Sequence, residues 1–424
     1  MQIENTTSSQ QFFMALNYIW TGFFAVAFVV AFIRFAVTGD AEIFKVIIDS
    51  TFSSSKSAVM DIALPLTGVM VLWLGLMNIG ERAGAVNFLA RIVGPFFERL
   101  FPELPRKSPV FGQMLMNFSA NMLGLDNAAT PLGLKAMQGL QDENPQKDTA
   151  SNAQIMFLVI NTSSLTIIPV SILAQRAILG AVNPTDIFIP VLLATAVSTL
   201  TGIIVVALRQ RINLFDRVIV SWIGGIIAAI GALTLWIGSM EKEQIEVVSK
   251  VGSNLLLILV IGSFIAGAVF RKVNVYEAFI DGAKSGFDVT IKIIPYLVGM
   301  LVGIAVFRAS GAMDYIIGGL AWFFGAVGLD TDFVAALPTA FMKPLSGSGA
   351  KAMMVEAMQH YGPDSFVGRL SCLFQGAADT TFYIIALYFG SVGIRKTRYA
   401  VTVGLIADLA GIVAAIVLAY MFFA

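Results

Sequence analysis

The sequence predicts an all-α polytopic membrane protein of two inverted repeats, each with a re-entrant helical hairpin and a broken transmembrane helix. Of the 424 residues, 57% are hydrophobic and 13% are charged, about half the charged share of soluble domains. Apolar stretches of about 20 residues, long enough to cross a bilayer, recur to the last residue. Unbroken runs such as 188–208 lack the alternation of a transmembrane β-barrel. A single soluble globule and a disordered chain are therefore excluded.

Charge and composition also exclude several function classes. The 27 basic and 27 acidic side chains cancel, and no basic domain exists, so a nucleic-acid-binding role is excluded. The chain has one cysteine, Cys372, and one histidine, His360, so it can form neither an internal disulfide nor a Cys/His metal cage. We therefore expect no metal site, no cofactor and no enzymatic activity, with His360 in a loop.

The apolar stretches divide into full spans and shorter amphipathic segments. Residues 1–11 lack the basic region of a cleaved signal peptide, so we expect a retained first span. Amphipathic stretches at about 42–54, 84–101, 275–285 and 312–327 are predicted to lie along the membrane surface. Full spans are predicted at about 13–37, 60–80, 151–180, 184–208, 215–240, 254–271, 287–308, 364–391 and 397–423.

Two further apolar segments, at about 108–140 and 333–358, do not have the pattern of one clean span. Each is interrupted near its middle by Gly, Pro, Asn, Ser or Thr. We expect each to form two half-helices that meet at a polar tip, a re-entrant hairpin. The span that follows each hairpin, at 151–180 and 364–391, also carries polar residues at its centre and is predicted to be broken.

The two halves of the chain repeat this order of elements. Ala83-Gly84-Ala85, followed by two phenylalanines, corresponds to Ser310-Gly311-Ala312, followed by two phenylalanines at the same spacing. We predict a first repeat over 1–210, a linker with an extra span over 211–250, and a second repeat over 251–424. Because the extra span makes the number of crossings before the second half odd, the repeats are predicted to be inverted, as in many secondary transporters.

Basic residues favour one orientation in the membrane. Placing the 82–107 loop in the cytoplasm puts most of the loop Lys and Arg residues on the cytoplasmic side. We therefore expect a multi-pass protein of the cytoplasmic (inner) membrane, with its N-terminus in the cytoplasm and its C-terminus outside.

The polar residues of the first hairpin are the first group of candidate site residues. An unpaired amide or carboxylate in hydrocarbon costs several kcal/mol, so these groups must face protein or water. Thr130 and Pro131 suit the cap and first position of a helix, which predicts a helix start at Pro131 within the membrane. Such a helix end attracts anions or polar solute atoms. The candidates here are Asn121, Asp126, Asn127 and Thr130.

The second hairpin carries an equivalent device, Pro344-Leu345-Ser346-Gly347-Ser348-Gly349, followed by a helix through Lys351. The glycines let the backbone approach a ligand closely, and the serines offer capping oxygens. The spacing of a nucleotide-binding P-loop is absent. The candidates here are Ser346, Ser348 and Lys351.

The broken spans supply the remaining walls of the predicted site. Unwound carbonyls and hydroxyls suit Na⁺ or a solute, and Asp126 or Asp379 could carry a proton or balance a cation. Small polar residues are also common where membrane helices pack, which is the alternative explanation for any one of them. Their recurrence at matching places in both halves favours a central polar site. The candidates are Asn161, Thr162 and Ser163 in the first half, and Gln375, Asp379, Thr380 and Thr381 in the second.

At these residues the chain resembles known families. Residues 15–208 resemble the spore maturation protein A family, and residues 254–420 resemble the spore maturation protein B family, so the chain resembles a natural fusion of the two. Both are similar to the nucleoside-recognition or gate domain family, which implies a transport core of hairpins and broken helices. The motifs are 72–77, 100–102, Leu125-Asp126-Asn127-Ala128-Ala129-Thr130-Pro131 and 161–163 in the first half, and 294–302, 307–312, Pro344-Leu345-Ser346-Gly347-Ser348-Gly349, 362–366 and Asp379-Thr380-Thr381-Phe382-Tyr383 in the second.

The leading functional hypothesis is a secondary transporter or permease for a small polar or anionic solute. The solute would bind near the midplane between the repeats, with coupling to Na⁺ or H⁺. A non-transporting envelope or spore-maturation scaffold is the first alternative. An intramembrane aspartyl protease using Asp126 and Asp379 is the second, although the Gly-x-Gly-Asp arrangement is absent. The expected partners are the solute and the lipid bilayer, and the surface helices could serve a homo-oligomer.

Overall fold

A computed structural model describes residues 8–105, 108–123, 126–163, 165–238 and 242–424. Within these residues the chain is helical, without strands apart from an isolated bridge between Thr149 and Lys396. The first half consists of α1 (Ser8–Thr38), α2 (Glu42–Ser57), a π-helical turn (Ala58–Ala63), α3 (Leu64–Arg82), α4 (Ala85–Leu100), α5 (Pro109–Met122), α6 (Asp126–Asp142), α7 (Asn152–Ser163), α8 (Val170–Ile178) and α9 (Phe188–Gln210).

Helix α10 (Arg217–Gly238) lies between the halves in sequence. The second half then follows the same element order as the first. It consists of α11 (Lys242–Phe270), α12 (Val275–Ala309), α13 (Ala312–Ala326), a 3₁₀ turn (Val334–Ala336), α14 (Leu337–Met342), α15 (Gly347–Tyr361), α16 (Phe366–Gly376), α17 (Thr381–Ser391) and α18 (Ala400–Phe423).

Two of the predicted surface helices do not exist as separate elements. The segment 42–54 is the beginning of one 41-residue helix, Glu42–Arg82, and the segment 275–285 is the beginning of α12. Each long helix carries a proline, Pro65 or Pro295, but neither proline ends it. Pro65 is the second residue of α3, just after the π-helical turn, where the regular backbone ladder is already interrupted, so its missing N–H costs little.

The other two predicted surface helices are confirmed as separate elements, α4 and α13. Each is entered through a glycine in the left-handed region, Gly84 (φ 82°) and Gly311 (φ 88°). This backbone conformation is strained for other residues and turns the chain sharply. The last part of α12 and helix α13 accordingly meet at 72°.

The described helices identify a multi-pass membrane protein. Five are long and apolar enough to cross a membrane, or six if the bent pair of α12 and α13 is one span. Two shorter apolar helices, Arg217–Leu233 and Asn254–Phe270, lie in α10 and α11. Many large apolar side chains are exposed on α1, α11 and α18, including Phe32, Ile258 and Leu409. A surface of this kind suits contact with lipid.

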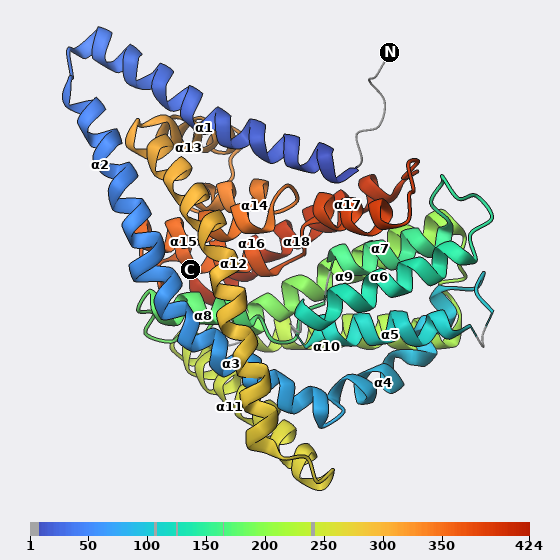
Figure 1. Ribbon diagram of the computed structural model, residues 1–424. Coiled ribbons are helices and arrows are strands. Elements are labelled where there is room, and N and C mark those ends of the chain that lie inside the picture. Colours follow the sequence, from blue (N-terminus) through green and yellow to red (C-terminus); the bar gives the residue numbers. More distant parts are fainter. Residues whose placement is uncertain (1–7, 106–107, 124–125, 164, 239–241) are drawn as a thin grey trace.

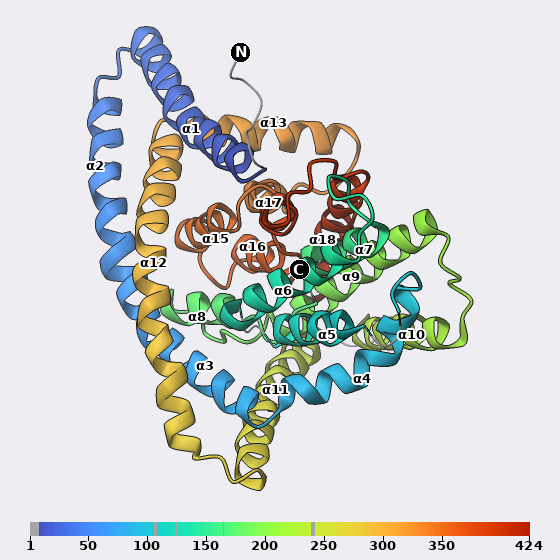
Figure 2. The ribbon, with the colours of Figure 1, turned by 45° about the vertical axis from the view of Figure 1, so that its right-hand side comes forward.

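Corresponding helices of the two halves pack against each other. Helix α3 runs along α12, and α9 runs along α18. Helix α1 contacts α12 while α11 contacts α3, and α7 contacts α18 while α16 contacts α9. Figures 1 and 2 show α2 and α12 side by side at one edge, with α15 to α17 inside them. These reciprocal contacts are those expected of two repeats, and both the repeats and their inversion stay predictions.

Candidate functional site

The first hairpin consists of α5 and α6. Helix α5 begins at Pro109, where the Ser108 hydroxyl accepts a hydrogen bond from the Val110 N–H (3.3 Å). The predicted helix start at Pro131 is wrong, because α6 begins at Asp126 and contains Pro131. At this position near the helix start the proline removes one backbone donor, and Ala128 and Ala129 before it favour a helix. Thr130 therefore lies inside α6 and does not cap it.

The second hairpin consists of α14 and α15, and here the predicted cap is confirmed. Helix α15 begins at Gly347, and the Ser346 hydroxyl accepts a hydrogen bond from the Gly349 N–H (3.0 Å). The Ser348 hydroxyl lies 3.3 Å from that of Ser346. Both serines therefore lie at the start of the half-helix, where unpaired N–H groups give a helix its positive end.

Both predicted broken spans are confirmed. Helix α7 ends at Ser163, and α8 begins at Val170 after Pro169. Helix α16 ends at Gly376, and α17 begins at Thr381 after Thr380. Each break leaves backbone groups that the regular helix ladder does not satisfy.

Backbone hydrogen bonds tie these interruptions together. In the first half, the Ile167 N–H at the break donates to the Met122 carbonyl of the hairpin (2.7 Å). In the second half, the Phe382 N–H donates to the Pro344 carbonyl of the hairpin (3.1 Å). The two breaks are joined directly, because the Asp379 N–H donates to the Thr162 carbonyl (2.7 Å). Four interrupted segments therefore meet at one place.

A cavity of about 480 Å³ opens where these segments meet. Met70, Ile168, Ile172, Leu297 and Ile384 are among its apolar lining residues. Its lining also includes many of the residues predicted from the sequence: Asn121, Thr130, Asn161, Ser348, Lys351, Gln375 and Asp379. The structure thus brings these residues from both halves to one polar space.

The two halves contribute different chemistry to this cavity. Among the described side chains, the charged ones in the lining are Lys343, Lys351 and Asp379, all from the second half. Lys343 is 7% exposed. The first half supplies amides and hydroxyls, with Asn121 and Asn161 at the hairpin and the break. The described lining therefore carries two cationic groups against one anionic group.

A buried cluster of amides and a phenol connects the halves beside the cavity. The Asn121 amide donates to the Asn161 carbonyl oxygen (2.8 Å), and the Tyr388 hydroxyl donates to the same oxygen (3.4 Å). The Asn117 amide donates to the Ala129 carbonyl (2.8 Å) and lies 3.4 Å from the Tyr388 hydroxyl. Sequence reasoning missed Tyr388, although it lies two turns after Thr381 on α17, a spacing that places both on one helix face.

Other predicted residues do not line the cavity. The hydroxyls of Thr162 and Ser163 donate to the Val159 carbonyl of their own helix. Thr380 caps α17 through its backbone position, and its hydroxyl is buried without a hydrogen-bond partner. The Thr381 hydroxyl donates to Asp408, a residue that sequence reasoning also missed (2.7 Å). For these residues the helix-packing explanation fits the geometry.

Asp126 and Asn127 lie in the first turn of α6, and their side chains are outside the described residues. Within the residues that are described, no group of three His, Cys, Asp or Glu is placed to hold a metal ion.

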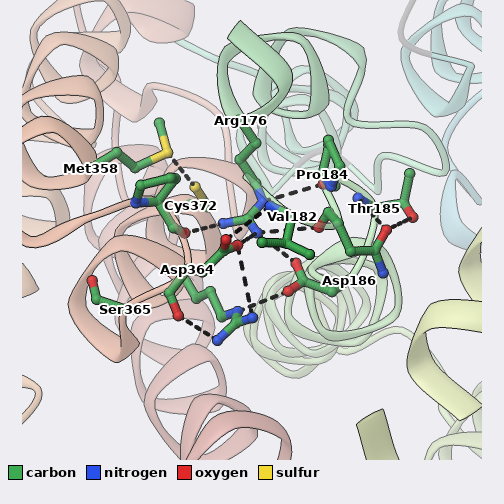
Figure 3. Close-up of polar contacts among 12 residues, drawn as sticks. Arg176, Val182, Pro184, Thr185, Asp186, Met358, Asp364, Ser365 and Cys372 are labelled. Atoms are coloured by element: carbon green, nitrogen blue, oxygen red, sulfur yellow. Dashed lines mark hydrogen bonds and ion pairs between the residues drawn. The ribbon is translucent and has the colours of Figure 1, made fainter. Parts of the chain in front are cut away.

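The halves also meet at a charged loop contact, defined as Arg176, Asp186, Asp364 and Arg369. It joins α8 and the loop that follows it, which carry Arg176 and Asp186, to the loop before α16 and the start of α16, which carry Asp364 and Arg369 (Figure 3). The buried Arg176 guanidinium lies 2.8 Å from the Asp186 carboxylate and 2.9 Å from that of Asp364. The Arg369 Nε lies 2.8 Å from Asp186. Burial raises the pKa of Asp186, although both arginines oppose this.

A neutral loop contact, defined as the side chains of Gln141, Asn144 and Gln154 and the backbone of residues 392–396, lies in the corresponding place, with the ion pair of Lys396 and Asp148 at its edge. It joins the loop between α6 and α7 to the loop between α17 and α18. The Asn144 amide donates to the side-chain oxygens of Gln141 and Gln154 (3.1 Å each). The Gln141 amide donates to the Val392 carbonyl (3.2 Å), and the Ala150 N–H donates to the Lys396 carbonyl (3.0 Å).

Comparison with known proteins gives a family and two relatives. A family model described as Nucleoside recognition (Gate) matches residues 63–179 and 290–395, just over half of the chain. Spore maturation protein B of Bacillus subtilis is 43% identical over 178 residues, 42% of this chain and 98% of that protein. Spore maturation protein A of the same organism is 41% identical over 157 residues, 37% of this chain and 80% of that protein. The two matches cover different parts of the chain, as in a fusion. No solved structure matches.

Proposed function

This chain belongs to the Nucleoside recognition family, and we propose that it is a secondary transporter or permease for a small polar or anionic solute. The solute binds in the cavity between the two halves. The cavity is the observation on which this proposal depends. Polar and charged groups are costly inside a membrane and face either one another or a water-filled pathway.

The size and charge of the cavity indicate the kind of solute. A volume of about 480 Å³ falls within the usual range for small-molecule sites, about 300–1,000 Å³. Lys343 and Lys351 face the space together with Asp379 and several amides, which suits a solute with at least one negative group. The start of α15, capped by Ser346, adds a positive helix end.

The transport cycle follows from the arrangement of the halves. Each half supplies one hairpin and one broken helix, and movement of one half against the other exposes the cavity to each side of the membrane in turn. The proposed orientation has a cytoplasmic N-terminus and an external C-terminus in the cytoplasmic membrane, with coupling to Na⁺ or H⁺. The proposal includes neither a resident cofactor nor a catalytic step.

The test is solute uptake by the purified protein in proteoliposomes. A thermal-shift screen with nucleosides, phosphates and organic acids selects solutes, since a ligand of the folded state stabilises it by mass action. Uptake is then compared between the wild type, Lys351→Gln, and the control Lys284→Gln, whose side chain is exposed outside the cavity. Loss of a charge-assisted contact should lower uptake by K351Q about 10- to 100-fold and leave K284Q unchanged.

The alternative is a non-transporting scaffold, a role that the names of the spore maturation relatives leave equally open. Under that alternative no solute in the screen is taken up, and K351Q behaves as K284Q does. That result would contradict the transport proposal.

A further inference from the structure

Helix α18 carries a buried carboxylate that the proposed solute site does not use. Asp408 is 4% exposed and is the ninth residue of α18, between Ala407 and Leu409. One of its oxygens, Oδ2, accepts a hydrogen bond from the Thr381 hydroxyl (2.7 Å). The other oxygen, Oδ1, is buried without a hydrogen-bond partner. Buried acidic groups in membrane spans are rare and mark functional sites by default.

The surroundings of Asp408 offer it little compensation. On its own helix, Gly404 and Gly411 pack closely against Thr381, Ser198 and Ala377. The Ser198 hydroxyl of α9 donates to the Ala407 carbonyl and not to the carboxylate (2.9 Å). The charged groups that act on Asp408 through space are Lys343, at the end of α14, and Asp379, at the break between α16 and α17. An ionised carboxylate here accepts one hydrogen bond from the described side chains, that of Thr381, whereas it can accept several.

We propose that Asp408 is a proton-binding site that couples proton movement to the transport cycle. The proposal rests on the proposed function. A proton is favoured over Na⁺ because a hard metal cation needs several oxygen ligands, and among described side chains the Thr381 hydroxyl is the one that bonds to this carboxylate. In the bound form the proton sits on a carboxyl oxygen, and on release it passes to water on the side to which the cavity is open.

Thr381 links Asp408 to the cavity. It is the first residue of α17 and lies two residues after Asp379. Asp379 lines the cavity, and its N–H donates a hydrogen bond to the Thr162 carbonyl. Seven residues further along the same helix, Tyr388 also lines the cavity and bonds to Asn161. Gain or loss of a charge at Asp408 therefore acts on the start of α17, the helix that carries Tyr388 and that directly follows the break containing Asp379.

The first test needs no solute. Dicyclohexylcarbodiimide enters apolar protein interiors and adds to a protonated carboxyl group, leaving a stable acylurea that mass spectrometry assigns to a residue. We expect the purified full chain to be labelled at Asp408 in mildly acidic buffer, with at least about tenfold less labelling in mildly alkaline buffer. One pH unit above the titration midpoint of a carboxyl group, its protonated fraction has fallen to about a tenth, and only the protonated form reacts. Equal labelling at all pH values, or no labelling at Asp408, overturns the proposal.

Variants make the assignment specific. Asp408→Asn should abolish the label at position 408. The control Asp148→Asn changes an exposed loop residue and should leave the label at Asp408 unchanged. Thr381→Val keeps the shape of the side chain but removes the hydroxyl that bonds to the carboxylate, so labelling should persist into more alkaline buffer. An unchanged pH profile in T381V contradicts the contact on which the proposal depends.

The second test separates this proposal from the transport proposal. Uptake of the solute selected by the thermal-shift screen is measured with and without an inwardly directed proton gradient. We expect the gradient to accelerate the wild type and to leave D408N unaffected, while D408N still exchanges solute across the membrane without a gradient. Equal acceleration of both proteins overturns the coupling role of Asp408 but leaves transport intact, and absence of uptake in both contradicts transport itself.

Discussion

The charged loop contact and the neutral loop contact lie in corresponding places of the two halves but are built from different chemistry. Each joins the loop that follows one half's hairpin to the loop before the other half's last helix. In one, two arginines and two aspartates are paired around Arg176, which is fully buried. In the other, side-chain amides centred on Asn144 bond to one another and to backbone carbonyls.

The two loop contacts should therefore differ in how they respond when the halves move apart. A buried ion pair gains its attraction only while both charges stay together, and separating them exposes the full cost of burial. An amide network loses its hydrogen bonds one at a time, each with a modest net contribution. Opening the charged loop contact should therefore cost its full free energy at once, whereas the neutral loop contact should lose its free energy in small steps, one hydrogen bond at a time.

The largest expected effect comes from removing the buried charge at the centre of the charged loop contact. Arg176→Met replaces the guanidinium with an apolar side chain and leaves Asp186 and Asp364 with Arg369 as the one remaining cation of the contact. We expect a loss of about 3–5 kcal/mol in the free energy of unfolding. The measurement is unfolding of the purified protein in detergent.

The matched control for R176M is Arg82→Met. Arg82 also pairs with an aspartate at 2.8 Å, Asp281, but the two side chains are 41% and 38% exposed. An exposed pair of this kind contributes at most about 1 kcal/mol. Equal losses in the two variants would refute the special role of the buried contact.

An intermediate effect is expected at the neutral loop contact. Asn144→Ala leaves the buried oxygens of Gln141 and Gln154 with fewer donors, which should lower the free energy of unfolding by about 1–3 kcal/mol. The control Gln138→Ala removes an exposed hydrogen bond to Asp142 on the same helix and should change stability by less than about 0.5 kcal/mol. If N144A were as damaging as R176M, the contrast between the two contacts would fail.

The sequence predicted the interruptions of the helices well, for a physical reason. Polar groups and prolines in an apolar segment must be accommodated by unwound backbone, so the breaks between Ser163 and Val170 and between Gly376 and Thr381 followed from residue types alone. Helix continuity was harder to predict. The segments 42–54 and 275–285 are amphipathic, but this pattern does not decide whether such a segment lies on the membrane or continues into a span.

The candidate site was predicted in composition but only partly in geometry. Lys351, Gln375 and Asp379 line the cavity, whereas Thr162 and Ser163 from an equally polar cluster bond to their own helix. Which face of a half-helix turns inward depends on packing between distant segments, and that information is not local in sequence. For the same reason Asp408, isolated among apolar neighbours, gave no signal, and the helical spacing of Tyr388 from Thr381 did not by itself place Tyr388 in the site.

The smallest expected effect distinguishes the two contacts by their response to pH. At the edge of the neutral loop contact, hydrogen bonds from Lys396 and Thr149 lower the pKa of Asp148. A carboxyl whose folded-state pKa lies below its unfolded value adds stability at neutral pH and loses it as the pH falls through the folded-state pKa. Asp186, whose pKa is raised by burial, has the opposite sign, because its contribution weakens as the pH rises from its unfolded to its folded value.

Asp148→Asn should therefore lower the unfolding temperature slightly at neutral pH, and the difference from the wild type should disappear in acid. The measurement is the unfolding temperature of both proteins over a pH series in the same detergent. Because Asp148 is exposed, added salt should also reduce the difference at neutral pH. If the difference in unfolding temperature between D148N and the wild type grew on acidification, the folded protein would not favour the ionised form of Asp148. The stability contributions of the two loop contacts would then change with pH in the same direction.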